Sequence, residues 1–122
     1  MYSIKKEVIE MIIHAARNAY PKEFIGLLGS RMENDCIDEL ILTHSVYGDS
    51  MSSIYMESKP IDRNIIGSVH SHPSHSNEPS DEDIHSFPKF GKIHLIISFP
   101  FNMDTIKMFD SKGKKIDFKV LG

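Results

Sequence analysis

Two histidines and an aspartate near the middle of the chain have the residue types and spacing of a metal site. His70 and His72 are two residues apart, and Asp83 follows eleven residues after His72. Imidazole and carboxylate donors together suit zinc among the first-row metals. A catalytic zinc typically takes three protein ligands and keeps a fourth position for water. We therefore predict a three-ligand zinc site, with about one ion per chain, of the kind that hydrolases use.

The strand expected before this motif explains why the histidines are two residues apart. Residues 64–69 have the composition of a buried strand. In an extended chain, residues i and i+2 point to the same side, so His70 and His72 can direct both imidazoles at one point. Pro73 cannot donate to a sheet ladder and is expected to end the strand.

The residues after Pro73 allow two interpretations. Loop-forming residues lead to a helix that begins near Ser80, which places Asp83 in the first turn, where its carboxylate can fold back toward the imidazoles. The alternative needs no metal: Ser80 is the N-cap, and Asp81, Glu82 and Asp83 are acids favoured by the helix dipole. In that alternative the two histidines are solvated loop residues. This stretch alone does not decide between the metal site and the capped helix.

A second stretch, far upstream, favours the metal site. Glu23 stands between Pro21, which ends a predicted helix, and a strand of apolar and glycine residues. Together the two stretches resemble the signature of the JAMM (MPN-plus) metallopeptidase family. The matching residues are Glu23 before Gly26-Leu27-Leu28-Gly29, then His70-Ser71-His72-Pro73, six further residues, Ser80, two further residues and Asp83. The resemblance spans essentially the whole chain, departs from the signature at no position, and is closest to the small stand-alone archaeal-type members.

This resemblance implies a role for each signature side chain. His70, His72 and Asp83 would hold zinc, Glu23 would act as general base, and the Ser80 hydroxyl would stabilise the oxyanion of amide hydrolysis. The implied substrates end in a flexible tail, as ubiquitin-like modifiers and small sulfur-carrier proteins do. The chain would hydrolyse the amide that joins this tail to a lysine or to a following residue.

Two other functions remain as alternatives. The family contains non-catalytic scaffold or binding modules, but these have typically lost metal ligands that are all present here. Relatives associated with DNA repair carry a similar pattern. The net charge of −3 and the absence of a recognisable DNA-binding segment count against a nucleic-acid partner.

Length and composition indicate one ordinary globular domain over residues 1–122. The 122 residues are 40% hydrophobic and 25% charged, which suits a single core. Cys36 is the single cysteine, so an internal disulfide is excluded and a simple core or surface thiol is expected. We find neither an apolar run of membrane-spanning length nor a signal-peptide pattern, and we expect a cytoplasmic protein without a membrane partner.

The order of predicted elements gives a mixed α/β domain. The resemblance implies one curved mixed sheet flanked by helices, related to the cytidine deaminase architecture. The predicted elements are a helix at 4–20, strands at 24–32, 36–46, 54–57 and 64–72, a helix at about 81–87, a strand at 92–99, and a hairpin of 105–109 with 115–121.

In the first helix, Ser3 is the predicted N-cap, and one stripe should face the core. The residues of this stripe are Ile4, Val8, Met11, Ile12, Ala15 and Ala19. His14 is interpreted as a packing or surface residue, and His94 as a satisfied core histidine within a buried strand. His44 is interpreted as structural because three better ligands exist.

Overall fold

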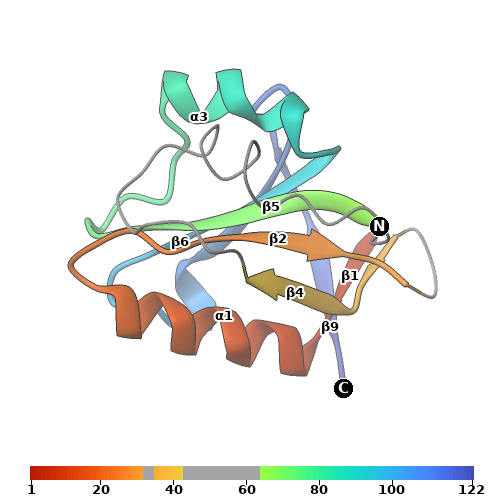
Figure 1. The fold of residues 1–122 in the computed structure, drawn as a ribbon, viewed down its shortest axis with the longest axis horizontal. Helices are drawn as coiled ribbons and strands as arrows, with labels where there is room; N and C mark the ends of the chain where they lie inside the picture. The colour runs from red at the N-terminus through yellow and green to blue at the C-terminus, as the bar shows by residue number, and fades with distance from the viewer. Residues whose placement is uncertain (32–34, 43–63) are drawn as a thin grey trace.

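A six-stranded mixed sheet forms the centre of the fold (Figure 1). The computed structural model describes residues 1–31, 35–42 and 64–122. The strand order in this sheet is β4 (Glu39–Leu42), β2 (Ile25–Gly29), β5 (Ile65–His72), β6 (Ile93–Ser98), β7 (Ile106–Asp110) and β8 (Lys115–Ile116). The pairing of β5 with β6 is parallel, and the other pairings are antiparallel. The predicted mixed α/β class is therefore confirmed.

A second, smaller sheet differs from the single sheet that was expected. It contains β3 (Cys36–Ile37), β1 (Tyr2–Lys5) and β9 (Phe118–Leu121), and both of its pairings are parallel. The predicted hairpin is correct only for β7 and β8. Residues 118–121 leave β7 and pair with the N-terminal strand, a long-range partner that local hydrophobic pattern cannot reveal.

Helix α1 begins later than the sequence indicated. It spans Lys6–Ala19, and its N-cap is Lys5, which makes no side-chain cap hydrogen bond. The prediction of Ser3 as N-cap is therefore wrong. Ser3 lies in β1 and donates its backbone N–H to Asp35 O at 2.9 Å. Residues 2–5 pair with β3 on one side and with β9 on the other. This strand pairing outweighs the modest preference of Ser3 for a helix N-cap.

The two α-helices among the described residues cover opposite faces of the large sheet (Figure 1). Helix α1 packs over one face, where Ile12 and Ala16 are fully buried. Met11 was expected in the core but is 46% exposed, because the stripe is rotated toward Ile9 and Ala16. On the other face lies α3 (Asp81–Ser86), followed by the short 3₁₀ helix η1 (Phe87–Lys89).

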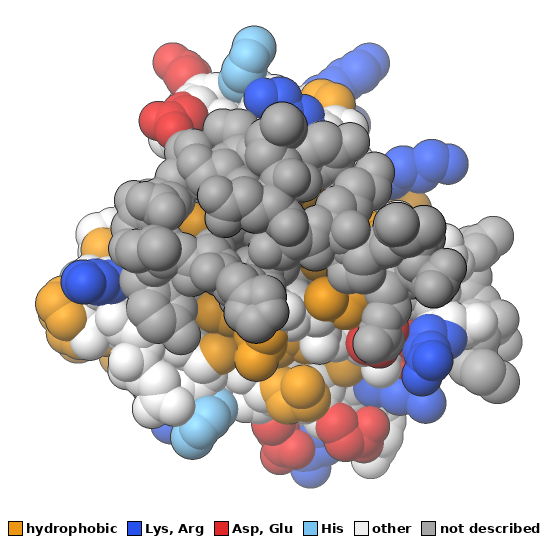
Figure 2. Space-filling model, viewed as in Figure 1, with side chains coloured by type: hydrophobic (Ala, Val, Ile, Leu, Met, Phe, Trp, Pro, Cys, Tyr) orange, Lys and Arg blue, Asp and Glu red, His pale blue; other side chains and the backbone are white. Residues whose placement is uncertain are grey.

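A groove of about 430 Å³ runs between α1 and the edge strand β4. Its lining residues are Glu7, Glu10, Met11, His14, Ala15, Leu40 and Leu42. Figure 2 shows hydrophobic and acidic side chains on this face of the molecule. The groove belongs to the α1 side of the sheet, away from α3.

Several predictions fall outside the described residues. These are the strand at 54–57, residues 43–46 of the strand at 36–46, and His44. Within the described part of the chain, no helix has the length and apolar character needed to cross a membrane.

Candidate metal centre

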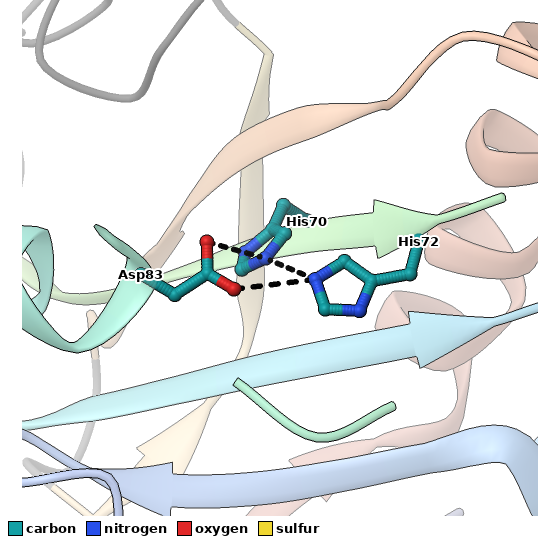
Figure 3. A group of neighbouring side chains, drawn as sticks. All are labelled: His70, His72 and Asp83. Carbon is teal, nitrogen blue, oxygen red and sulfur yellow. Dashed lines mark hydrogen bonds and ion pairs between the residues drawn. The ribbon is translucent and has the colours of Figure 1, made fainter. Parts of the chain in front are cut away.

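The structure brings the three predicted ligands together at one end of the large sheet (Figure 3). His70 and His72 extend from the last residues of β5, and Asp83 reaches them from the first turn of α3. The two Nε2 atoms are 3.1 Å apart. Asp83 Oδ1 is 3.3 Å from His70 Nε2, and Asp83 Oδ2 is 3.2 Å from His72 Nε2.

The donor atoms are spaced like neighbouring ligands of one metal ion, with each histidine facing a different oxygen of Asp83. With ligand bonds of about 2.0–2.1 Å, tetrahedral geometry holds neighbouring donors roughly 3.3–3.4 Å apart. The observed separations between His70, His72 and Asp83 are within about two tenths of an ångström of that range. Two imidazole nitrogens that face each other also need a cation or a proton between them. The donor set and its geometry therefore fit zinc.

Burial and hydrogen bonding orient the two imidazoles differently. His70 is 1% exposed, and its Nδ1 has no hydrogen-bond partner among the described residues. His72 Nδ1 lies 3.0 Å from Ser76 O and donates its proton to this carbonyl, so the Nε2 of the neutral ring is the nitrogen available to a metal ion. A ligating histidine commonly donates its second ring N–H to a backbone carbonyl in this way.

The electrostatics of the site keep the carboxylate ionised. Burial alone would raise the pKa of Asp83, but hydrogen bonds from His70 and His72 outweigh it and hold that pKa well below its usual range. For His72, burial opposes protonation, but the contacts with Asp83 and Ser76 raise its pKa above the ordinary value. An ionised carboxylate beside imidazoles is the state that a metal cation requires.

Ser80 and Asp83 form a capping box at the start of α3. Asp83 N donates to Ser80 Oγ at 3.1 Å, and Ser80 N donates to Asp83 Oδ2 at 2.9 Å. The N-cap interpretation and the ligand interpretation therefore both apply to these residues. The serine backbone and the helix terminus hold the carboxylate that faces the histidines.

Glu23 lies beside the cluster without belonging to it. It directly precedes Phe24 and β2, and β2 pairs antiparallel with β5 in a register that sets Ile25 opposite His70. Glu23 lies two residues before this pair on one strand, and His72 lies two residues after it on the other. The glutamate carboxylate is close enough to contribute to the raised pKa of His72. Glu23 is partly buried.

Ser71, the residue between the two histidines, was not among the predicted site residues. Ser71 is fully buried, and its hydroxyl accepts a hydrogen bond from Phe24 N at 2.8 Å. The sequence signal that could have drawn attention to Ser71 was its position between the two histidines of the His-x-His motif. His94, expected to be a core histidine, stacks on Phe87 with ring centroids 4.1 Å apart and lies 2.8 Å from Ser68 Oγ through Nδ1.

Comparison with solved structures shows which class of protein this fold and site define. A JAB1/MPN domain protein from Archaeoglobus fulgidus superposes with a TM-score of 0.81 at 36% identity, covering all of both chains. A structure described as JAMM, a metalloprotease-like zinc site in the proteasome and signalosome, superposes with a TM-score of 0.79 at 33% identity, covering 100% of this chain and 99% of the other.

Sequence comparison gives the family. Residues 5–110 match the model of the prokaryotic homologs of the JAB domain, and the chain belongs to that family. A probable metalloprotease of Haloferax volcanii is 29% identical over 127 residues, covering 97% of this chain and 78% of the relative. The predicted JAMM resemblance is therefore confirmed. The family, the relative and the His-His-Asp cluster support metallopeptidase activity.

Proposed function

We propose that this chain is a zinc-dependent metallopeptidase that hydrolyses the amide at the tail of a ubiquitin-like or small sulfur-carrier protein. The convergence of donor atoms from His70, His72 and Asp83, all within 4.8 Å of one another, carries the proposal. When bound there, a zinc ion would lower the pKa of a water molecule to about 7 and polarise the substrate carbonyl.

Glu23 is the proton carrier in this mechanism. Its carboxylate is close enough to His72 to help raise the pKa of that imidazole, is partly buried, and is not one of the three donor groups. It takes the proton of the attacking water and then delivers it to the departing amine, as a general base and acid of suitable reach does. An amide nitrogen that is not protonated leaves poorly, so both transfers matter.

Ser80 supplies a hydrogen-bond donor to the oxyanion. Its oxygen already accepts from Asp83 N, which leaves the hydroxyl hydrogen free to point toward the developing negative charge. Loss of one such donor costs about 3 kcal/mol of transition-state stabilisation in other hydrolases. The capping box makes this donor rigid, because the serine backbone is bonded to the Asp83 carboxylate.

The substrate class follows from the resemblance of the signature residues and needs a direct test. The purified chain is incubated with the ubiquitin-like and sulfur-carrier proteins of its own host, each joined through its tail either to a lysine side chain or to a following peptide. We expect cleavage after the tail that stops on adding a chelator and returns on adding zinc. A chain that binds these proteins and holds zinc, yet cleaves none of them, would contradict the proposal and indicate a binding module.

A further inference from the structure

Phe24 and Ser71 are joined by two hydrogen bonds just beyond the point where the regular pairing of β2 with β5 ends. Ser71 N donates to Phe24 O at 2.9 Å, and Phe24 N donates to Ser71 Oγ at 2.8 Å. Both residues are buried, with exposed fractions of 2% for Phe24 and 0% for Ser71. We call this arrangement the Ser71–Phe24 clamp.

The clamp departs from an ordinary antiparallel ladder. There, two opposed residues exchange a pair of N–H···O=C bonds. Here one of the two acceptors is a side-chain hydroxyl in place of the Ser71 carbonyl. The last regular pair is Ile25 with His70. The Ser71 hydroxyl therefore extends the pairing of β2 with β5 by one residue, although the Ser71 carbonyl no longer takes part in it.

The location of the clamp gives it a consequence for the metal centre. On one side, Ser71 lies between His70 and His72 in the chain; on the other, Phe24 follows Glu23 directly. The clamp thus ties the backbone of Glu23 to the strand that carries both histidines. Without the hydroxyl, the Phe24 N–H would be a buried donor with no acceptor, a state that costs about 1–3 kcal/mol and favours local rearrangement.

We propose that Ser71 is a positioning residue, whose hydroxyl holds the Phe24 amide and thereby keeps the Glu23 carboxylate within reach of the metal centre. This inference rests on the proposed function, because it assigns Ser71 to the proton transfer by Glu23. Ser71 itself touches neither substrate nor ion. Displacement of a catalytic group by about 1 Å can cost on the order of 100-fold in rate.

The first test compares Ser71→Ala with Ser71→Thr and a matched control. Ser68→Ala removes another fully buried hydroxyl from β5, one that contacts His94 Nδ1 at 2.8 Å and not Phe24. We expect Ser71→Ala to keep its zinc and to lose at least about 10-fold in kcat with little change in KM. Ser71→Thr, which retains the hydroxyl, should recover most of the rate, and Ser68→Ala should match wild type in rate despite losing stability.

A double-mutant cycle separates positioning from general loosening. If Ser71 acts through Glu23, Ser71→Ala should cost nothing further in kcat when it is added to Glu23→Gln. A merely structural role would lower kcat by the same factor in both backgrounds. Equal factors, or an undiminished rate in Ser71→Ala, would overturn the proposal.

Two measurements test the Ser71–Phe24 clamp without requiring cleavage of a substrate. Hydrogen exchange at the Phe24 amide should be faster in Ser71→Ala than in wild type and in Ser68→Ala. The visible spectrum of the cobalt-loaded chain, followed over pH, should change its midpoint in Ser71→Ala in the same direction as we expect in Glu23→Gln. If the wild-type chain cleaves no conjugate, the proposed function is contradicted. Hydrogen exchange and the cobalt spectrum still test the clamp in that case. Unchanged exchange and an unchanged spectrum would reject the clamp even if cleavage is found.

Discussion

Asp83 serves two purposes at once at the residue scale. Its backbone N–H and its carboxylate complete the capping box with Ser80, and the same carboxylate faces both histidines. An aspartate at this position is short enough to return to the N-cap and to aim both oxygens at the imidazoles. The helix terminus therefore fixes a metal ligand as part of its own capping.

Ser80→Ala should lower both stability and activity. Loss of the cap should cost about 1 kcal/mol of unfolding free energy, and loss of the oxyanion donor should reduce kcat by about 100-fold or more. Denaturant unfolding and conjugate cleavage measure the two effects. Asn102→Ala is the control, because Asn102 caps the 3₁₀ helix η2 (Met103–Thr105) with a similar box. It should lose comparable stability and keep its rate; full turnover in Ser80→Ala would leave Ser80 with the capping role alone.

Glu23→Gln should separate proton transfer from metal binding. Glutamine keeps the size of the side chain but cannot accept a proton, so we expect normal folding and normal zinc content with a kcat at least about 100-fold lower. Metal analysis and cleavage are measured on the same preparation. Loss of zinc would make Glu23 a ligand, and undiminished cleavage with full zinc would remove it from the mechanism.

The candidate site could be predicted from sequence because its residues follow local rules. Strand alternation places His70 and His72 on one side, and helix-start chemistry places Asp83 in a first turn. The contribution of Ser71 could not be predicted in this way. It depends on which strand lies beside β5 and in which register, and a single sequence does not specify either.

Close backbone approach sets the geometry of β5 at the element scale. Gly67 is paired with Ile93 of β6, and a Cβ built on Gly67 would lie 1.7 Å from Ile93 O. Lys92 N also donates to Ile66 O at 2.9 Å, so the chain entering β6 is held against β5. The parallel pair that ends at the metal centre starts from this contact.

Gly67→Ala should therefore destabilise the protein strongly. The methyl group would meet backbone that cannot move without breaking the parallel pairing, and overpacking of this kind costs about 3 kcal/mol or more. Gly29→Ala in β2 is the control, since its Cβ would approach the flexible Glu39 side chain at 3.2 Å. Thermal unfolding of both variants measures the difference. Equal melting temperatures would show that β5 and β6 can separate at Gly67 without penalty.

Sequence patterns predicted the central elements better than the peripheral ones. Strands 64–72 and 92–99 correspond to β5 and β6, and the helix at 81–87 corresponds to α3 and η1. The sequence pattern predicted Ser3 as N-cap and placed Ile4 and Lys5 in the first helix, because the strand pattern at residues 2–5 is short and ambiguous. Their actual partners, β3 and β9, are distant in sequence, and pairing with them decides the outcome.

Acid should destabilise the whole molecule through His94. Burial lowers the pKa of His94 to about 4, against an ordinary value of 6.5. The unfolded chain therefore binds a proton between pH 6.5 and 4 while the folded chain does not, so stability falls as pH decreases through that range. The full effect is on the order of 3 kcal/mol.

Denaturant unfolding of the metal-free protein between pH 7 and 4 measures this dependence. His94→Gln, although less stable at pH 7, should lose most of the slope, whereas His85→Gln, which changes an exposed histidine of α3, should keep it. A slope that is the same in all three proteins would show that other groups cause it.

The central claim is that one zinc ion is held by His70, His72 and Asp83, and metal content tests it most directly. Purified chain should carry about one zinc. The double variant His70→Ala/His72→Ala and the single variant Asp83→Ala should carry none. A matched double variant, His75→Ala/His85→Ala, changes two exposed histidines near the site and should retain the ion. Stoichiometric zinc in His70→Ala/His72→Ala would contradict the account.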